Sequence, residues 1–253
     1  MDFDDWEKHF SRILDKEVEE YLDENSSELF VETPLKSKQQ QKEQTKDELM
    51  KAFRLEDSEN RIERALILIR DLLPKYVSAD EWDVISTEFI QSDEALVAHF
   101  EAMEEKKSEQ EDAHFSIAEM CGISEKTLNS CYKLGETLYK EKQYSDARAL
   151  FAFLTAISPE VPEFWICSIL CCNQMKQYPE AIELCKLGQQ LFPENIAMYI
   201  HGANNCIANG DTTEAEIALD HAKKIIGNSP ESKKAWGETY QYLKSRAGNY
   251  KKI

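Results

Sequence analysis

The sequence predicts an all-α protein, and three observations support this fold class. All eight glycines lie at or after Gly122, so the preceding part of the chain lacks the residue best suited to hairpin turns and left-handed caps. No stretch alternates apolar and polar residues for long enough to form a strand. The C-terminal half also repeats with a period of 34 residues, which is typical of stacked helix pairs.

Charge divides the 253 residues into two parts. The net charge is −18, and residues 1–120 carry all of the excess, with 33 acidic side chains against 15 basic ones. Residues 121–253 contain 15 of each. Such a charge repels phosphates and anionic lipid head groups, which argues against nucleic acid or a membrane as a partner. The acidic N-terminus and the lack of an 18-residue apolar run predict a cytoplasmic protein without a signal peptide or membrane insertion.

Residues 1–46 predict an N-terminal amphipathic helix followed by a polar linker. The helix is expected over residues 3–22, where apolar residues recur at intervals of three and four and form one stripe. The stripe consists of Phe3, Trp6, Phe10, Ile13, Leu14, Val18, Tyr21 and Leu22. Residues 33–46 contain Leu35 as their single apolar side chain, which favours a solvated linker or a frayed helix.

Residues 47–121 predict an acidic module of three or four helices. One helix should end at Pro74, because proline has no backbone N–H to donate. Ser78 to Glu81 form a capping-box pattern at the start of the next helix. A further helix is expected over about residues 93–107. The segment from Ile117 to Ile123 is expected to cover the first repeat.

Residues 122–253 predict three tetratricopeptide repeats, a short α-solenoid, with a capping C-terminal helix. The repeats are set at 128–161, 162–195 and 196–229, and the capping helix covers Lys233 to Arg246. Matching positions recur 34 residues apart: Tyr144 with Tyr178, Ala147 with Ala181 and Ala215, and Pro159 with Pro193. The pairs Leu134-Gly135 and Gly202-Ala203 are the expected points of close helix contact. Three repeats are about the minimum that closes a core.

The first helix of each repeat is expected to line a concave groove. Its second, fifth, ninth and twelfth positions should face inward, and the side chains there are mostly apolar or amide. Asparagines at these positions are suited to hold the backbone of an extended peptide. The alternative is that some of these residues pack under the N-terminal helices of the same chain. The candidate groove residues are Tyr132, Glu136, Tyr139, Ile166, Leu170, Asn173, Ile200, Asn204 and Ile207.

Nothing in the sequence points to catalysis, a metal or a cofactor. The seven cysteines are an odd number without a C-x-x-C spacing, so we interpret them as reduced thiols in a cytosol. No P-loop, G-x-S-x-G or H-E-x-x-H motif is present. Glu111 and His114 have the Glu-x-x-His spacing of a di-iron bundle, but such a site needs a second copy. We therefore predict that the protein is not an enzyme.

Specific residues in the repeats also resemble a known family. The stretches are GISEKTLNSCYKLGETLYKEKQYSDARALFAFL, VPEFWICSILCCNQMKQYPEAIELC and DTTEAEIALDHAKKII. Together with the lead-in Ile123-Ser124, they look like the class II chaperones of type III secretion, of the low-calcium-response protein H type. The resemblance covers about residues 117–245.

This resemblance implies a virulence-associated chaperone in the bacterial cytosol. Its partner would be a hydrophobic secreted translocator, or another secretion substrate, held through an extended segment until export. Tyr132, Tyr139 and Tyr144 stand where the family uses aromatic groove residues, whereas Glu136 departs from its apolar pattern. Family members pair through an N-terminal helix, which here would be residues 3–22. The alternative is a generic tetratricopeptide scaffold, or a needle-subunit co-chaperone that binds a helical protein.

Overall fold

The computed structural model describes residues 19, 22–23, 37–54, 56–105, 116–227 and 229–250. Within these ranges the chain is helical and contains no strand. The chain separates into two compact units, Met1–Val161 and Pro162–Ile253. This division places the first repeat with the helices that precede it, one repeat later than the boundary expected from the sequence between residues 121 and 122.

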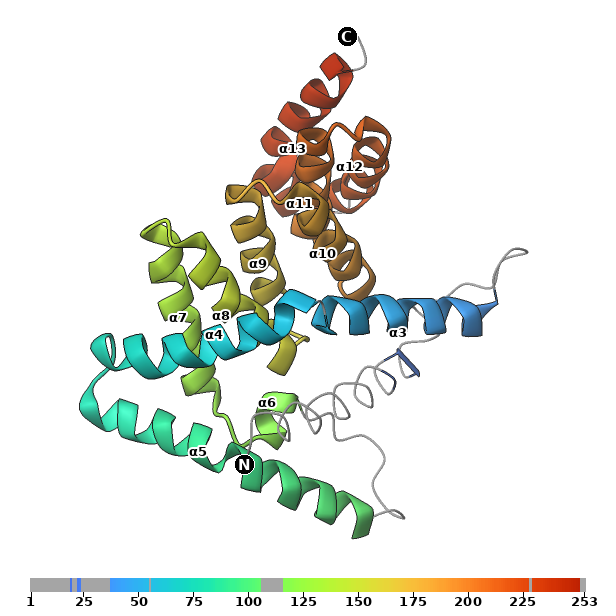
Figure 1. The fold of residues 1–253 in the computed structure, drawn as a ribbon. Coiled ribbons are helices and arrows are strands. Elements are labelled where there is room, and N and C mark those ends of the chain that lie inside the picture. The colour runs from blue at the N-terminus through green and yellow to red at the C-terminus, as the bar shows by residue number, and fades with distance from the viewer. Residues whose placement is uncertain are drawn as a thin grey trace. The chain divides into compact units, whose positions relative to one another are not determined.

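The first unit contains six described helices and one short 3-10 turn (Figure 1). They are α3 (Lys38–Arg54), α4 (Glu56–Leu72), η1 (Leu73–Lys75), α5 (Ala79–Glu105), α6 (Ile117–Met120), α7 (Glu125–Lys140) and α8 (Tyr144–Ile157). The second unit contains the remaining helices. They are α9 (Pro162–Gln174), α10 (Tyr178–Leu191), α11 (Ile196–Asn209), α12 (Thr212–Gly227) and α13 (Pro230–Tyr250).

The polar segment at residues 33–46 is helical from Lys38 onward, where α3 begins. Two lysines of α3 hold the chain around residue 20: Lys42 Nζ lies 2.5 Å from Asp23 Oδ1, and Lys46 Nζ lies 2.6 Å from Glu19 Oε2. Leu22, on the predicted apolar stripe, is fully buried. The remainder of the predicted helix at residues 3–22, and its predicted pairing, lies outside the described residues.

Helix α4 packs on α8, the second helix of the first repeat. Its sequence spaces apolar residues at intervals of three and four, and Ala65, Leu68 and Ile69 are buried. At one edge of this contact Arg64 donates two hydrogen bonds to the Asp146 carboxylate, from Nε at 2.8 Å and Nη2 at 2.9 Å. This pair raises the pKa of Arg64. As predicted, the α-helix ends just before Pro74.

Helix α5 is attached to the start of α7 by its carboxylates. Ser78 Oγ accepts from the Glu81 N–H at 3.2 Å, but the Glu81 carboxylate accepts from Ser130 Oγ at 2.8 Å. Glu88 accepts from both the N–H and the hydroxyl of Ser124, which caps α7. The capping-box prediction is thus confirmed for the Ser78 bond, while Glu81 serves a tertiary contact.

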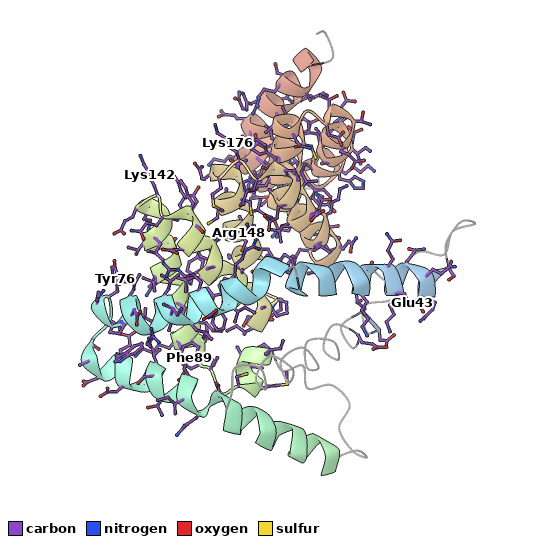
Figure 2. All side chains as sticks on the ribbon, viewed as in Figure 1. Glu43, Tyr76, Phe89, Lys142, Arg148 and Lys176 are labelled. Carbon is purple, nitrogen blue, oxygen red and sulfur yellow. The ribbon has the colours of Figure 1, made fainter. Side chains whose placement is uncertain are left out.

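The predicted break before residue 93 is wrong, because α5 runs unbroken from Ala79 to Glu105. No proline or glycine lies in this stretch to end a helix. Phe89 of α5, labelled in Figure 2, packs on Phe153 of α8. The ring centroids are 6.1 Å apart. The N-terminal helices therefore share a core with the first repeat.

The three predicted helix pairs are all present, as α7–α8, α9–α10 and α11–α12. The capping helix is present as α13, which packs on α11 and α12. Its Tyr240, Leu243 and Ala247 join the buried core of the third repeat, with Trp236 partly buried beside them. Before the first repeat, α6 begins with a complete capping box between Ser116 and Glu119. Its Ile117 is buried.

The same turn joins the two helices of every repeat. Lys142, Lys176 and Gly210 have φ values of 64°, 60° and 86°, in the left-handed region, and lie 34 residues apart. In each turn two crossed backbone hydrogen bonds close the first helix, for example Lys142 N to Tyr139 O at 3.0 Å and Gln143 N to Leu138 O at 2.9 Å. This pattern is a Schellman motif. Figure 2 shows both lysines where their helices end.

Small residues bring the helices into close contact, as predicted for Gly135 and Gly202. A Cβ atom at Gly135 would lie 2.8 Å from two ring carbons of Phe151, and one at Gly202 would lie 3.4 Å from Cys185 Cβ. Phe151 is itself buried, so its ring has little room to move. The Gly135 contact therefore depends on the missing side chain, whereas at Gly202 the closest atom is Nε2 of the flexible Gln189 side chain, at 2.9 Å.

We expect Gly135→Ala to lower the free energy of unfolding by about 1–3 kcal/mol, because the added methyl group overpacks the contact with Phe151. Gly237→Ala in α13 is the matched control, since the nearest atom to its new Cβ is 3.9 Å away. That change should stabilise the helix by up to about 1 kcal/mol. Urea unfolding of both variants measures the difference, and equal effects would contradict the packing argument.

Candidate peptide-binding surface

The candidate residues of the first repeat form two aromatic pairs in the first unit. Tyr132 of α7 contacts Phe151 of α8, with ring centroids 5.8 Å apart, and Tyr139 meets Tyr144 edge-on at 5.2 Å. All three tyrosines are partly buried, so each ring keeps part of its surface accessible. An apolar ring with a polar hydroxyl at its edge is suited to contact both the side chains and the backbone of a peptide.

Glu136 lies between the two tyrosines of α7, one turn from each. Its carboxylate is 3.7 Å from Lys140 Nζ, and its side chain is 40% exposed. The stripe of α7 formed by Tyr132, Glu136 and Tyr139 is therefore aromatic with one carboxylate in the middle. This charge is the departure from the family pattern that the sequence indicated.

In the second unit, α9 contributes Ile166, Leu170 and Asn173, all partly buried. Asn173 Nδ2 donates to Asn205 Oδ1 on α11 at 2.7 Å. Asn205 is fully buried, and its own Nδ2 donates to the carbonyl of His201 at 2.8 Å. This chain of hydrogen bonds fixes the Asn173 amide and ties α9 to α11.

The prediction does not hold for two candidates on α11. Ile200 is 2% exposed and Ile207 is fully buried. Both belong to the core of the third repeat, which α13 completes with Tyr240 and Leu243. The reason is the capping helix: it packs on α11 and takes up the apolar side chains that an uncapped repeat would expose.

Asn204, between these two isoleucines in the sequence, is partly buried and contacts α13 through a polar bond. Arg246 Nη1 donates to its Oδ1 at 3.1 Å. Arg246 also lies over the ring of Tyr242, 5.7 Å from the centroid. Neither Asn205 nor Arg246 was predicted from the sequence, because the repeat pattern selects only groove positions on the first helices. The neighbouring asparagines of the GANNC stretch were the available signal for Asn205.

Comparisons with known proteins identify what the repeats are similar to. A family model for the tetratricopeptide repeat matches residues 128–160. The chain is 29% identical over 118 residues to the low calcium response locus protein H of Yersinia pseudotuberculosis, covering 47% of this chain and 70% of that protein. The resemblance predicted from the sequence is confirmed.

Solved structures extend the likeness to the fold. The type III secretion translocator chaperone SycD of Yersinia enterocolitica matches with a TM-score of 0.50 and 27% identity, over 53% of this chain and 99% of SycD. A chain of a type III secretion complex from Aeromonas hydrophila matches with a TM-score of 0.50 and 19% identity. The match covers 59% of this chain and 95% of that chain, and it shows similarity of fold alone. The predicted all-α tetratricopeptide fold is confirmed.

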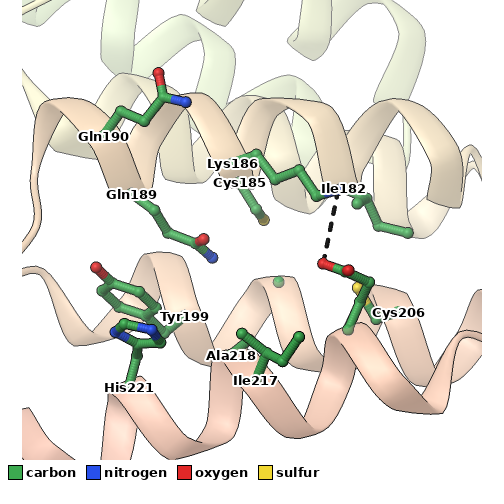
Figure 3. Close-up of a pocket in the computed structure, with 12 residues that line it drawn as sticks. Ile182, Cys185, Lys186, Gln189, Gln190, Tyr199, Cys206, Ile217, Ala218 and His221 are labelled. Carbon is green, nitrogen blue, oxygen red and sulfur yellow. Dashed lines mark ion pairs between the residues drawn. The ribbon is translucent and has the colours of Figure 1, made fainter. Parts of the chain in front are cut away.

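A separate pocket of about 290 Å³ opens between α10, α11 and α12 (Figure 3). Tyr199 and His221 stack at one end with ring centroids 5.5 Å apart, and Lys186 pairs with Glu214 at 3.7 Å across the opening. Gly202 lines this pocket, and it lies two residues, about 200°, around α11 from Asn204. The pocket is thus on the opposite face of α11 and contains none of the predicted site residues.

The buried thiols are poor nucleophiles. Burial raises the pKa of Cys131 to about 12 and that of Cys206 to about 11, and it raises the pKa of Cys185 as well. These thiols are therefore protonated at neutral pH. Burial also lowers the pKa of His201, which keeps its imidazole uncharged at pH 7.

Across the part of the chain that the structure describes, no three His, Cys, Asp or Glu side chains are grouped to hold a metal ion. Within the same residues, no helix has both the length and the apolar character needed to cross a bilayer.

Two adjacent asparagines should differ sharply when removed. Asn205→Ala deletes a fully buried amide and leaves the His201 carbonyl and the Asn173 amide without their partner, so we expect a loss of about 1–3 kcal/mol in unfolding free energy. Asn204→Ala is the control, because its partner Arg246 is partly exposed and can donate the freed N–H to water. This variant should lose less than about 0.5 kcal/mol of unfolding free energy. Chemical denaturation measures the free energy of unfolding of both variants. Equal losses would show that the Asn173–Asn205 hydrogen bond contributes no more to stability than the Asn204–Arg246 hydrogen bond.

Proposed function

We propose that this protein is a non-catalytic chaperone of type III secretion in the bacterial cytosol. It binds an extended apolar segment of a translocator protein and keeps that protein soluble until export. The observation that carries the proposal is the match to the translocator chaperone SycD over 99% of that chain. The similarity to low calcium response locus protein H over 118 residues supports the same proposal.

The aromatic pairs supply the apolar contacts in this proposal. Tyr132, Tyr139 and Tyr144 keep part of their rings accessible, as do Ile166 and Leu170 on α9. Each buried square ångström of apolar surface contributes about 25 cal/mol, so a few anchor side chains supply several kcal/mol. Ordering the peptide offsets part of this gain, which favours an affinity of roughly micromolar strength that permits release.

The asparagines supply the contacts to the peptide backbone. Asn173 uses its Nδ2 for Asn205, and Asn204 uses its Oδ1 for Arg246. Among the described residues, Asn173 Oδ1 and Asn204 Nδ2 have no partner, so one acceptor and one donor remain for a peptide N–H and C=O. This fits a guest in extended conformation, whose backbone groups are not satisfied internally.

Binding without chemistry is consistent with the side chains present. The thiols at Cys131, Cys185 and Cys206 are buried, and burial raises the pKa of each, so they are protonated and poor nucleophiles at neutral pH. A homodimer through residues 3–22 stays a prediction, as does a second role for the acidic N-terminal part.

The proposal predicts that Tyr132→Ala/Tyr139→Ala loses the translocator. Tagged wild type and double variant are used to capture partners from the cytosol of the native bacterium, and the partners are identified by mass spectrometry. Wild type should recover a protein with hydrophobic, membrane-inserting segments, and the double variant should recover at least tenfold less because two apolar contacts are missing.

Tyr76→Ala is the control, since Tyr76 is 51% exposed and lies outside the repeats; it should bind as wild type does. Circular dichroism melting of each variant separates lost binding from lost folding. Recovery of the same translocator by the folded double variant would exclude the tyrosines as its site. Recovery of only a short amphipathic helical protein would favour a needle-subunit co-chaperone.

A further inference from the structure

Arg246 differs from the other arginines with described partners in having no carboxylate beside it. Arg64 pairs with Asp146, and Arg70 pairs with Asp71. Arg246 instead makes its described contacts with the Asn204 amide at 3.1 Å and the Tyr242 ring at 5.7 Å. Within the described residues no acidic side chain lies within ion-pair distance of it. A guanidinium without a counter-charge is notable in a chain with 48 acidic residues.

The two helices that carry Asn204 and the Asn173 amide, α11 and α9, are almost free of charge. Helices α9 and α11 contain one ionised side chain between them, Glu163 in the first turn of α9. His201 of α11 is neutral at pH 7 because burial lowers its pKa. Asn205, the residue after Asn204, accepts a hydrogen bond from the Asn173 amide. Arg246 is therefore the cation that α13 brings to an apolar and amide surface.

The arginine is also held in place before any guest arrives. The core of the third repeat buries Leu243 and Ala247 on either side of it in α13, which fixes the helix. One N–H is used by Asn204, and the ring of Tyr242, which is 62% exposed, lies along the guanidinium. Arginine has five N–H donors in a fixed planar arrangement. Those not bound to Asn204 are suited to a two-oxygen contact with a carboxylate.

From these contacts we infer that Arg246 recognises an Asp or Glu side chain of the guest segment. This inference rests on the proposed function, and it adds to it the chemistry of the guest: apolar anchors accompanied by an acidic residue that reaches the α11–α13 edge. The partly buried position favours a strong contact, because solvent and salt screen it less than an exposed pair.

The test uses the translocator recovered with the wild-type protein in the capture experiment. Overlapping 15-residue peptides that span it are labelled with fluorescein, and the peptide that the full-length chain binds most tightly is the probe. Each Asp or Glu of the probe is then replaced by Asn or Gln. Fluorescence anisotropy measures the affinity of every peptide for wild type, Arg246→Gln, Arg246→Lys and Lys244→Gln.

We expect one acidic position whose neutralisation weakens binding to wild type about tenfold. The same peptide change should leave the affinity of the Arg246→Gln variant unchanged, since this variant already lacks the contact. Arg246→Lys should keep part of the preference, because lysine retains the charge but not the planar pair of donors. Lys244→Gln removes the same charge from the exposed side of α13, where Lys244 lies 5.8 Å from the Tyr240 ring, and should keep the full preference.

Three results would overturn the inference. If the tightest peptide has no acidic residue, or if its neutralisation changes nothing in wild type, the guest is bound without Arg246 and the proposed function stands. If Lys244→Gln loses the preference for the acidic peptide over its neutralised form as fully as Arg246→Gln does, the preference comes from the overall charge of the protein and not from Arg246. If wild type binds none of the peptides, or recovers no translocator, the proposed function fails and the inference fails with it.

Discussion

The repeat architecture depends on a chain reversal made by one residue in the left-handed conformation. At residues 142, 176 and 210 the backbone leaves the first helix of a repeat with φ between 60° and 86°, and the second helix begins within two residues. Two crossed hydrogen bonds close the helix each time. Without this reversal the two helices would not lie antiparallel, and contacts such as Gly135 on Phe151 would not form. Lysine fills this conformation twice, although it costs an L-residue about 1 kcal/mol or more.

The sequence predicted most of the fold, because a 34-residue period fixes which residues meet. Ala147, Ala181 and Ala215 are all fully buried at the same position of their repeats. Local rules failed where tertiary contacts compete with them. Glu81 has the capping-box spacing but turns to Ser130, and α5 continues past residue 93 because nothing in its sequence stops it. The left-handed lysines could not be predicted, since the residue type gives no sign of its φ.

The candidate surface was predicted less completely, and the reason lies in α13. Counting positions on the first helices selected Tyr132, Tyr139 and Asn173, which are partly buried in the structure. It failed for Ile200 and Ile207, because their exposure is decided by a capping helix some 40 residues away in the sequence, whose core residues include Leu243. The same helix brings Arg246 to Asn204. A repeat pattern describes what the repeats share, whereas a terminal cap is by nature different from them.

The acidic excess of the chain does not oppose a contact between Arg246 and an acidic guest. The excess belongs to residues 1–120, whereas residues 121–253 are neutral overall. At physiological ionic strength the field of exposed charges decays over about 8 Å, so an exposed charge farther away than this contributes little to the energy of a bound peptide. A partly buried guanidinium acts at hydrogen-bond distance, where screening is weakest. The apolar anchors then determine how tightly a guest binds, and the single cation determines which apolar segment is accepted.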